Sequence, residues 1–575
     1  MNFRHFIFCG TVALFACSCV NIDTNLGQNF IPIEQQYEAR TAEFPLEDIQ
    51  MKTVSNMSGY SSRRITVGAL RDDTFGLTTR SGAFTLVPFT DTLDFGKNPK
   101  FRQFHISLQR DTLSVTDASQ LKIFQNINVY SLRDAGIVLD ENYVYTDAIK
   151  DSDFASCQRI TDGVPVYNGG DSLSFNFTRN FGEDEFNRFV KGCDNDGIYI
   201  IDTISNYIKD FPGIYLCCDE PVGNGGRLNF FDVALQTNSD GYIHGNYAEL
   251  KFTADYGTRE KVDTSFFFLF GAAGFSETGA LPEQYAFNVS AREGLVPESQ
   301  AEDVIYVEGS TGLKPVFSSR EIREKLLAWF ATSEGGMITD PEAINEVVIN
   351  KATIEIPFDM PEEYTQMALY PSVLSATCCI KSTDDDGQTL YSYANLTDAS
   401  ISAENHGDID RSRLVYAPDI SFHAQKILGL EDPDDDIYAN YDIWMLILAD
   451  EITVTQNQSS ANDDYYSQMM YYNYLNSMYG GYGGYGGYGG YGYGGYGYGY
   501  GSGYGYGSYG YNNYYSMLYY SQMMNAMNSS DSNTTITQEL DRDRFYRAIL
   551  NGPGSTGRKP VLKVTYSVPR SAESK

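Results

Sequence analysis

The chain has 575 residues, which is enough for two to four domains and for a sizeable hydrophobic core. Its 75 acidic side chains outnumber the 41 basic ones and give a formal net charge of -34 at pH 7. This balance argues against nucleic acid and against an anionic membrane surface as partners, because contacts with phosphate groups need clustered Lys and Arg.

The first nineteen residues have the pattern of an export signal. Phe6 to Ala16 form a mostly apolar run of about 11 residues, the length of a signal-peptide core rather than of a membrane span. A small residue followed by Cys comes next and resembles the lipobox of bacterial lipoproteins, in which the Cys is acylated and becomes the new N-terminus. Cys19 fits better than Cys17, because Ser18 precedes it and a bulky Phe lies near Cys17. We therefore expect residues 1–18 to be a lipoprotein signal peptide and Cys19 to be lipidated; the alternative is an ordinary secretory signal.

Strand patterns begin after a polar leader. Residues 19–62 are polar without a sustained period and predict a flexible tether. Further on, Phe104, Ile106 and Leu108 alternate with polar residues, which predicts a strand with one apolar face and a solvated His105 on the other. The same alternation occurs at Ala352, Ile354, Ile356 and Phe358, and at Leu562, Val564 and Tyr566. Abundant Thr, Tyr, Val and Phe supports an all-β interpretation.

The sequence predicts three short helices. The first runs from Ser319 to about Phe330, because Ser318 and Glu321 have the spacing of a capping box. The other two are indicated by apolar residues at helical spacing, which are Phe186, Phe189 and Val190 after Gly182, and Phe545 and Ile549 within Asp541 to Leu550.

Together these patterns predict a mainly β fold of two β-sandwich or jelly-roll-like domains with a few short helices. The N-terminal β-rich domain is expected over residues 63–298 and the C-terminal one over 299–575. A Gly/Tyr-rich insert, residues 457–535, interrupts the second domain, and its middle has Tyr at every third residue from Tyr479 to Tyr491. High glycine content and the lack of aliphatic residues predict a disordered loop spliced between two strands. Its role as an adhesive tether or as a repeat expansion stays open.

Catalytic signatures are absent from the sequence, which has no Gly-x-Ser-x-Gly, no His-Glu-x-x-His and no Walker loop. Asp432, Asp434 and Asp436 have the spacing of a calcium loop, but Ile437 and Ile443 stand where that loop needs Gly and Glu, so a solvated acidic turn is favoured. The same interpretation applies to residues 384–387. We expect a protein that is not an enzyme and has no cofactor and no metal site; a carboxylate pair for glycoside hydrolysis stays open.

The exported chain keeps six cysteines besides Cys19, including the vicinal pairs Cys217-Cys218 and Cys378-Cys379. Export permits disulfides, but six cysteines in so long a chain do not make a disulfide-stapled scaffold. No spacing matches a zinc site. Neighbours in a strand point to opposite faces, and packing as small apolar residues is the favoured role.

Short motifs follow the lipobox in a fixed order: Leu26-Gly27, Ile31-Pro32, Val67-Gly68, Asp73-Thr74-Phe75-Gly76, Tyr306 to Leu313, Val348 to Ala352 and Lys559 to Tyr566. This order and spacing resembles the DUF4270 lipoproteins of Bacteroidetes over nearly the whole mature chain except the insert. The resemblance implies an outer-membrane lipoprotein of mostly β structure with no assigned activity, so it supplies no catalytic residues. Read from the residues alone, Gly68, Gly76, Gly309 and Gly312 serve turns that need positive φ or close backbone approach.

Three functions are expected, in decreasing preference. The first is a lipid-anchored outer-membrane protein that docks on other envelope proteins as a structural or assembly component. The second is a surface glycan-binding lipoprotein, because the closing segment also resembles the terminal strands of jelly-roll modules in secreted carbohydrate-active proteins. The third is a glycan hydrolase. Whether the protein faces the periplasm or the cell exterior stays open, since Asp23 is the only acidic residue close to Cys19.

Overall fold

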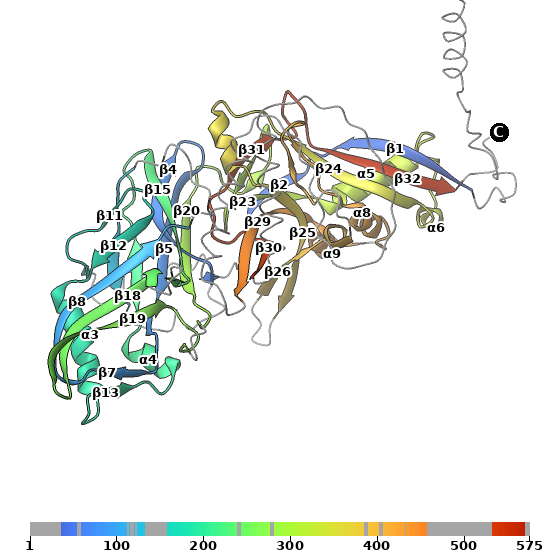
Figure 1. Ribbon diagram of the computed structural model, residues 1–575. Helices are drawn as coiled ribbons and strands as arrows, with labels where there is room; N and C mark the ends of the chain where they lie inside the picture. The colour runs from blue at the N-terminus through green and yellow to red at the C-terminus, as the bar shows by residue number, and fades with distance from the viewer. Residues whose placement is uncertain are drawn as a thin grey trace, which may run out of the picture.

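The computed structural model describes residues 36–569, except for gaps at 55–58, 112–113, 115–119, 121–122, 133–157, 238–242, 277–280, 384–388, 402–405, 432 and 457–531. The described chain is mainly β with several antiparallel sheets and few helices, which confirms the predicted fold class. Figure 1 shows two β-rich bodies side by side, here named the N-terminal module (residues 59–293) and the C-terminal module (residues 36–54 and 299–569). Within these ranges, no helix is both long and apolar enough to cross a bilayer.

Two main sheets build the N-terminal module. Their strands are β3 (Tyr60–Ser61), β4 (Arg64–Asp72), β5 (Gly76–Phe84), β6 (Leu86–Pro88), β8 (Lys97–Gln109), β10 (Asn128–Ser131), β12 (Ser172–Asn176), β14 (Ile214–Cys217), β15 (Gly225–Asp232), β18 (Tyr247–Tyr256), β19 (Arg259–Phe270) and β20 (Ala286–Glu293). The larger sheet has the order β10-β14-β5-β20-β3, with β4 pairing both β5 and β15. The smaller sheet has the order β12-β8-β18-β19-β6.

Three two-stranded ribbons and two helices complete this module. The ribbons pair β9 (Gln125–Asn126) with β11 (Val166–Tyr167), β7 (Thr92–Asp94) with β13 (Ile198–Ile200), and β16 (Gln236–Thr237) with β17 (Ile243–Gly245). The helices are α3 (Arg179–Gly192) and α4 (Ile204–Asp210). The α3 helix confirms the prediction made from Phe186 and Phe189, both of which are buried, although it begins before Gly182. Thr178 caps it by accepting a hydrogen bond from the backbone N–H of Phe181.

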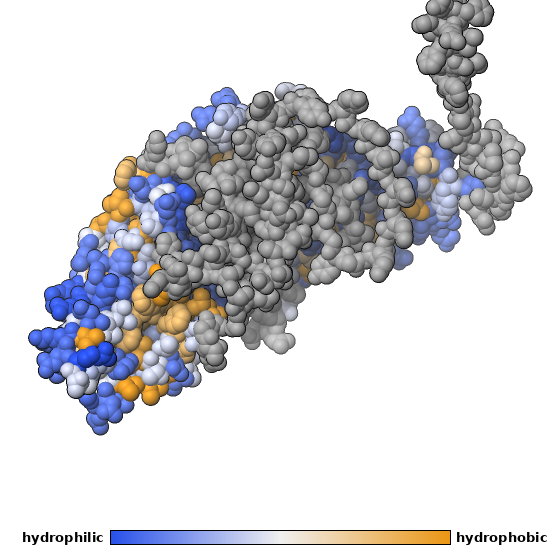
Figure 2. All heavy atoms as spheres, in the orientation of Figure 1, coloured by the Kyte–Doolittle hydropathy of each residue, from blue (hydrophilic) through white to orange (hydrophobic). Residues whose placement is uncertain are grey.

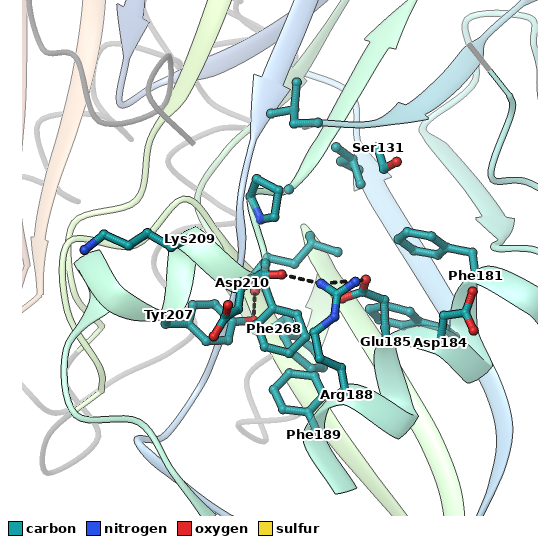
Figure 3. A pocket seen from close by; sticks show the side chains of 17 residues that line it. Ser131, Phe181, Asp184, Glu185, Arg188, Phe189, Tyr207, Lys209, Asp210 and Phe268 are labelled. Carbon is teal, nitrogen blue, oxygen red and sulfur yellow. Dashed lines mark hydrogen bonds and ion pairs between the residues drawn. The ribbon is translucent and has the colours of Figure 1, made fainter. Parts of the chain in front are cut away.

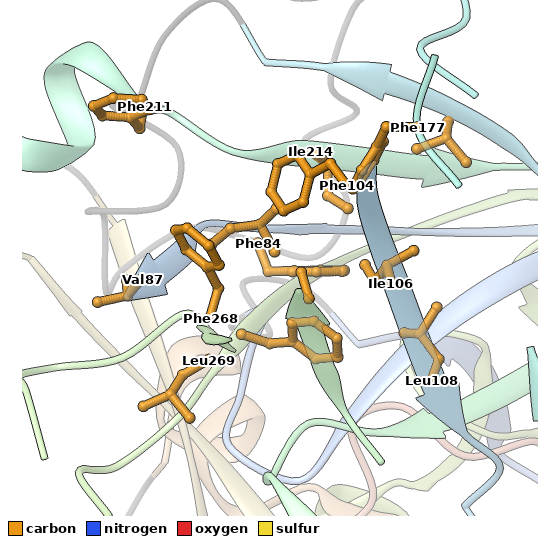
Figure 4. Close-up of a cluster of buried hydrophobic side chains, with 14 of the residues drawn as sticks. Phe84, Val87, Phe104, Ile106, Leu108, Phe177, Phe211, Ile214, Phe268 and Leu269 are labelled. Carbon is orange, nitrogen blue, oxygen red and sulfur yellow. The ribbon is translucent and has the colours of Figure 1, made fainter. Parts of the chain in front are cut away.

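Aromatic and aliphatic side chains fill the core between these sheets. Figure 4 shows Phe104, Ile106 and Leu108 of β8 in one cluster with side chains of neighbouring strands. All three are buried, which confirms the predicted strand and its apolar face. His105 lies on the other face, where its Nδ1 is 2.9 Å from Oδ1 of Asn176. It is therefore a strand histidine with a polar neighbour, as its position in the alternation predicts.

The C-terminal module contains two larger sheets and one ribbon. Its strands are β1 (Tyr37–Pro45), β2 (Ile49–Thr53), β21 (Ser299–Gln300), β22 (Val304–Glu308), β23 (Leu313–Phe317), β24 (Val348–Pro357), β25 (Val373–Thr383), β26 (Thr389–Asn395), β27 (Ile409–Asp410), β28 (Val415–Tyr416), β29 (Ile443–Gln456), β30 (Ser532–Leu540), β31 (Arg547–Asn551) and β32 (Val561–Pro569). One sheet has the order β1-β32-β24-β28-β27, and the other β21-β2-β23-β29-β25-β26 with β30 on β29; β22 pairs with β31. The alternating residues predicted in β24 and β32 are buried.

Short helices cover the sheets of this module. They are α5 (Ser319–Phe330), α6 (Pro341–Ile344), the 3-10 helix η5 (Tyr364–Leu369), α7 (Thr397–Ile401), α8 (Ser421–Leu428) and α9 (Asp435–Tyr441). The α5 helix has the predicted bounds, and the Ser318 side chain accepts a hydrogen bond from the backbone N–H of Glu321 as the capping-box spacing predicts. Its buried face includes Ile322 and Leu326, while Nε1 of the half-buried Trp329 donates to the Tyr566 hydroxyl at 2.8 Å.

The predicted tether over residues 19–62 is wrong from Tyr37 onward. β1 pairs along its whole length with β32, and β2 pairs with β23, so residues 37–53 belong to the C-terminal module. Phe44 and Ile49 are buried there. The sequence of this segment is polar, which led to the prediction of a tether. It is polar because β1 is an edge strand in which most residues are exposed.

The helix predicted over Asp541 to Leu550 is also wrong. Its second half is strand β31, which pairs with β22, and its first half is a turn in which Asp541 Oδ1 accepts from the backbone N–H of Arg544 at 2.9 Å. Phe545 is buried and Ile549 is 39% exposed, so the two do not share a buried helical face. A strand partner more than 200 residues away overrides the local four-residue spacing.

The chain passes between the modules after β20 and before β21, close to the boundary predicted at residues 298 and 299. The predicted end of the insert at residue 535 is wrong, because strand β30 already begins at Ser532. The remaining insert residues, 457–531, lie outside the described chain. β29 and β30 pair antiparallel on either side of them.

Candidate functional site

The predicted lipidation site lies outside the described residues, as do the signal peptide at 1–18 and the alternative Cys17. The structure places the first residue after this region at one end of the body. Tyr37 of β1 pairs with Pro569 of β32, and Figure 1 shows this pair of strand ends at the tip of the C-terminal module that is far from the N-terminal module. The described chain therefore starts at that tip.

The acidic run at 432–436 begins a helix. Asp434 caps α9, with Oδ1 accepting from the backbone N–H of Ile437 at 2.8 Å, and Asp435 pairs with Arg320. Asp432 and residues 384–387 lie outside the described chain. Among the residues that the structure describes, no group of three His, Cys, Asp or Glu could hold a metal ion.

The described cysteines form no disulfides with one another, and most of them are half-buried. They are Cys193, Cys217, Cys218, Cys378 and Cys379. Burial raises the pKa of Cys378 to about 11. Cys379 is buried beside Trp444, whereas Sγ of Cys378 lies 3.9 Å from Nε2 of His423, so this vicinal pair points to opposite faces as predicted. The predicted role as small apolar packing residues is confirmed, since Cys379 is buried and the other four are half-buried and pack against the hydrophobic cores.

The Gly/Tyr-rich stretch lies in the sequence between two strands that pair with each other. β29 and β30 pair from Leu448 with Leu540 to Gln456 with Ser532. This confirms that the stretch is spliced between two strands. Its adhesive and repeat-expansion interpretations stay predictions, because residues 457–531 are outside the described chain.

A cluster of buried charges joins the two modules, here named the junction. The Arg64 guanidinium on β4 bonds to Asp111 of its own module at 2.9 Å, and to Glu451 at 2.9 Å and Asp543 at 2.6 Å of the C-terminal module. Arg544 also bonds to Glu451, at 3.0 Å. Burial lowers the pKa of Arg64, but the three carboxylates raise it by more, so its pKa lies well above the ordinary value. The cation is therefore permanent, and its partners lie on both modules.

Two segments that carry the family resemblance meet at the junction. The rings of Phe75 and Tyr306 pack edge to face with centroids 5.7 Å apart. Arg547 lies over the Phe75 ring at 4.7 Å and pairs with Asp72. Gly76 begins β5 with φ +82°, a conformation that other residues rarely adopt. The predicted role of this glycine is confirmed, since a Cβ there would also lie 2.4 Å from a backbone oxygen.

The turn before β23 wraps around a buried lysine. Lys314 Nζ donates to the carbonyl oxygens of Ser310 at 2.9 Å and Gly312 at 3.1 Å, and to that of Glu308. Burial lowers the pKa of Lys314 to about 8, although nearby carboxylates raise it. Gly309 is tightly enclosed, because a Cβ on it would lie 2.7 Å from the backbone oxygen of Arg544. The motif also contacts the N-terminal module, because the Arg80 guanidinium of β5 donates to the Ser310 hydroxyl at 3.0 Å.

Apolar side chains from both modules also meet at the junction. They are Leu70, Leu228, Phe230, Leu369 and Phe545, all buried. The space lined by Arg544, Phe545 and Arg547 measures only about 20 Å³. The junction thus holds the modules as one body.

A cavity of about 490 Å³ opens in the N-terminal module and is here named the α3–α4 cavity. Its volume lies in the range of about 300–1,000 Å³ that is typical of small-molecule sites. Figure 3 shows side chains of α3 and of the end of α4 gathered around it. The residues that line it include Leu86, Phe104, Ser131, Phe181, Asp184, Glu185, Arg188, Phe189, Tyr207, Lys209, Asp210, Phe211, Ile214 and Phe268.

Arg188 ties the two helices together beside this cavity. Its guanidinium donates to the backbone oxygen of Asp210, pairs with the Glu185 carboxylate at 3.3 Å, and lies 5.0 Å from the centroid of the Phe211 ring. Phe211 stacks on Phe189 with centroids 4.3 Å apart and planes 15° apart. The arginine is 45% exposed, so it remains accessible from the cavity.

Glu185 is poised to exchange a proton near neutral pH. Burial raises the pKa of Glu185 to about 7; Arg188 lowers it only in part, and Asp184 raises it further. Its side chain is 15% exposed. Tyr207 stays neutral, since burial raises its pKa well above the ordinary value and its hydroxyl donates to the Leu86 oxygen at 2.6 Å.

A smaller space of about 180 Å³ lies on the C-terminal module and is here named the aromatic hollow. Tyr393 and Trp444 meet edge to face with centroids 5.5 Å apart. Lys52 Nζ lies 5.9 Å from the Trp444 ring, and Lys381 Nζ lies 5.9 Å from the Tyr391 ring. Polar groups of Thr53, Glu298 and Asp442 complete the lining.

Comparisons with family models, with curated proteins and with solved structures found no match. The features of the described chain that bear on function are the junction, the α3–α4 cavity and the aromatic hollow. None of these three places was predicted from the sequence. For the cavity a signal exists, since Glu185 and Arg188 are three residues apart on a predicted helix. The junction has no local signal, because Arg64 and Glu451 are 387 residues apart.

Proposed function

We propose that the protein is an outer-membrane lipoprotein of the DUF4270 type, held in the bilayer by acyl groups on Cys19, that docks on other envelope proteins as a non-enzymatic structural or assembly component. The observation that carries this proposal is the junction, which makes one body of two modules with the N-terminal strand at one tip. A rigid body anchored at one tip is suited to holding a partner at a fixed distance from the membrane.

The length of the leader supports this arrangement. Fully extended, the chain between Cys19 and Gln36 spans at most about 60 Å. The C-terminal module would then stay near the bilayer, and the junction would fix the N-terminal module beyond it. Figure 2 shows patches of apolar residues on the visible face of the N-terminal module. Exposed apolar patches are typical of surfaces that bind other proteins.

Metabolic labelling with radioactive palmitate tests the anchor. The wild-type protein should carry label and fractionate with membranes, and Cys19→Ala should lose both, because a lipid chain contributes about 0.8 kcal/mol for each buried methylene. Cys17→Ala is the matched control and should keep both. An unlabelled wild-type protein would refute the lipid anchor, and loss of label in Cys17→Ala alone would move the lipid to Cys17.

Affinity purification from detergent-solubilised membranes tests docking. The tagged wild-type protein should retain an envelope protein at a fixed stoichiometry. Cys19→Ala, extracted in the same detergent, should retain the same partner when membranes and soluble fraction are pooled, since the body makes the contact. Recovery of the protein alone, together with retention on a glycan column, would overturn the docking proposal.

Glycan binding at the aromatic hollow is the second candidate. The observation that favours it is the group of Tyr391, Tyr393 and Trp444 beside lysine and carboxylate side chains, because rings pack on the apolar faces of sugars while charged groups bond to hydroxyls. Titration with oligosaccharides should change the fluorescence of Trp444. The change should disappear in Tyr391→Ala and persist in Trp329→Phe, whose ring lies on α5 and bonds to Tyr566. Equal responses in all three proteins would exclude this site.

A further inference from the structure

The α3–α4 cavity already holds one cation, which the protein itself supplies. The Arg188 guanidinium lies over the Phe211 ring, pairs with Glu185 and donates to the backbone oxygen of Asp210. An aromatic face, a carboxylate and a carbonyl oxygen all favour positive charge. Neither docking nor glycan binding at the aromatic hollow uses this cavity.

Acidic groups outnumber basic ones around the cavity. α3 presents Asp184 and Glu185 against Arg188, and the end of α4 presents Asp210 against Lys209. The other elements that line the cavity add no charged side chain; their residues include Leu86, Phe104, Ser131, Ile214 and Phe268. The cavity therefore combines apolar walls with a rim that is net negative when Glu185 is ionised, in a chain whose formal net charge is -34.

We propose that the α3–α4 cavity binds a small organic cation with an apolar or aromatic body. The ammonium group lies beside Glu185 and Asp184, and the body packs against Phe181 and Phe268. The volume of about 490 Å³ accommodates a ligand of this kind without displacing a helix. The proposal does not depend on the docking function or on the lipid anchor.

Proton exchange by Glu185 gives this binding a characteristic pH dependence. The ammonium group prefers the ionised carboxylate, and burial raises the pKa of Glu185 to about 7. Glu185 is protonated in most protein molecules at pH 6 and ionised in most of them at pH 8. The affinity for the organic cation should therefore rise about tenfold between these two pH values.

Calorimetric titration of the full-length protein in a nonionic detergent tests the proposal. The probe is 2-phenylethylamine, which is cationic over the whole pH range. Its uncharged analogue 2-phenylethanol and its anionic analogue 3-phenylpropanoate have a similar body. The amine should bind at least tenfold more tightly than the alcohol, and the carboxylate should bind most weakly.

Variants on one helix assign the effect to the cavity. Glu185→Gln should weaken amine binding at least tenfold at pH 8 and abolish the pH response. Glu183→Gln makes the same charge change outside the cavity, at a residue paired with Arg179 at 2.8 Å, and should leave binding unchanged. Arg188→Met should tighten amine binding several-fold, because it removes the competing cation while keeping an apolar side chain.

Circular dichroism at each pH confirms that the variants are folded. If Glu185→Gln is unfolded, Asp184→Asn takes its place, and about threefold weaker amine binding is expected because Asp184 is exposed. The proposal is overturned if the alcohol binds as tightly as the amine, if the carboxylate binds more tightly, or if Arg188→Met weakens amine binding. Absence of binding at millimolar amine overturns it as well.

Discussion

The junction and the α3–α4 cavity use the same kinds of side chains in opposite ways. At the junction, Arg64 bonds to three carboxylates at 2.6 to 2.9 Å, and these side chains are at most 7% exposed. At the cavity, Arg188 is 45% exposed and pairs with Glu185 at 3.3 Å. About 20 Å³ of free space lies beside the junction, against about 490 Å³ in the cavity. The first arrangement is closed, and the second still has room for a ligand.

This difference separates stability from binding. A closed cluster of charges is costly to open, because each carboxylate left without its partner stays buried. A partly open pair can exchange a partner or a proton at a smaller cost, and its electrostatics remain available to a ligand. Arginines that look alike in the sequence therefore have different roles, and substitutions should reveal this.

The largest effect is expected at the junction. Arg64→Met keeps the length of the side chain but leaves Asp111, Glu451 and Asp543 without their shared cation. We expect the free energy of unfolding to fall by about 3–5 kcal/mol. Urea titration followed by circular dichroism measures this loss.

Arg63→Met is the matched control for this prediction. Arg63 is the preceding residue, and its pair with Glu539 at 3.3 Å is half-exposed. The control should lose less than about 1 kcal/mol. Equal losses in the two variants would mean that the junction is no more than a surface contact.

Local patterns in the sequence predict the elements of this fold well. Ser318 and Glu321 predict the start of α5, and the apolar alternation of Phe104, Ile106 and Leu108 predicts one face of β8. Each prediction needs only residues within one turn or one strand, because capping and amphipathicity are local properties. The mainly β class follows from the same patterns.

Contacts between distant segments are not predictable in this way. Residues 37–45 look like a tether because their partner strand β32 lies at the other end of the chain. The prediction of a helix over Asp541 to Leu550 is wrong for the same reason, since the distant strand β22 pairs with β31 in this region. The junction and the α3–α4 cavity are both made by such contacts, so local periodicity identifies their elements but not their sites.

A smaller change in stability is expected at the cavity, where removing a charged group should stabilise the protein. The folded protein raises the pKa of Glu185 from 4.5 to about 7, so it binds more protons than the unfolded chain between these pH values. Stability from this group is therefore present at low pH and is lost as pH rises from about 4.5 to 7. Glu185→Gln removes the loss and should stabilise the protein at pH 8 by up to about 3 kcal/mol, with little change at pH 4.5.

The difference between variant and wild type isolates Glu185 from other groups. Burial also raises the pKa of Asp232, beside the junction, but this contribution is the same in both proteins. Glu183→Gln, on the same helix, should change stability by less than about 0.5 kcal/mol at either pH. A wild type that is more stable than Glu185→Gln at pH 8 would show that the Arg188 pair outweighs the cost of burial.

The smallest effect tests whether the junction couples the modules. Thr178 caps α3 in the N-terminal module, and Ser318 caps α5 in the C-terminal module. Thr178→Ala and Ser318→Ala should each cost about 1 kcal/mol. Because the junction holds both modules in one body, each variant should lower the midpoint of the same single unfolding transition, seen by calorimetry and by Trp fluorescence.

The same substitutions in the Arg64→Met background test the coupling. There the modules should unfold separately, so Ser318→Ala should lower only the transition of the C-terminal module, which contains both tryptophans. Independent transitions already in the wild-type protein would mean that the charges at the junction hold the modules in contact without making their unfolding cooperative.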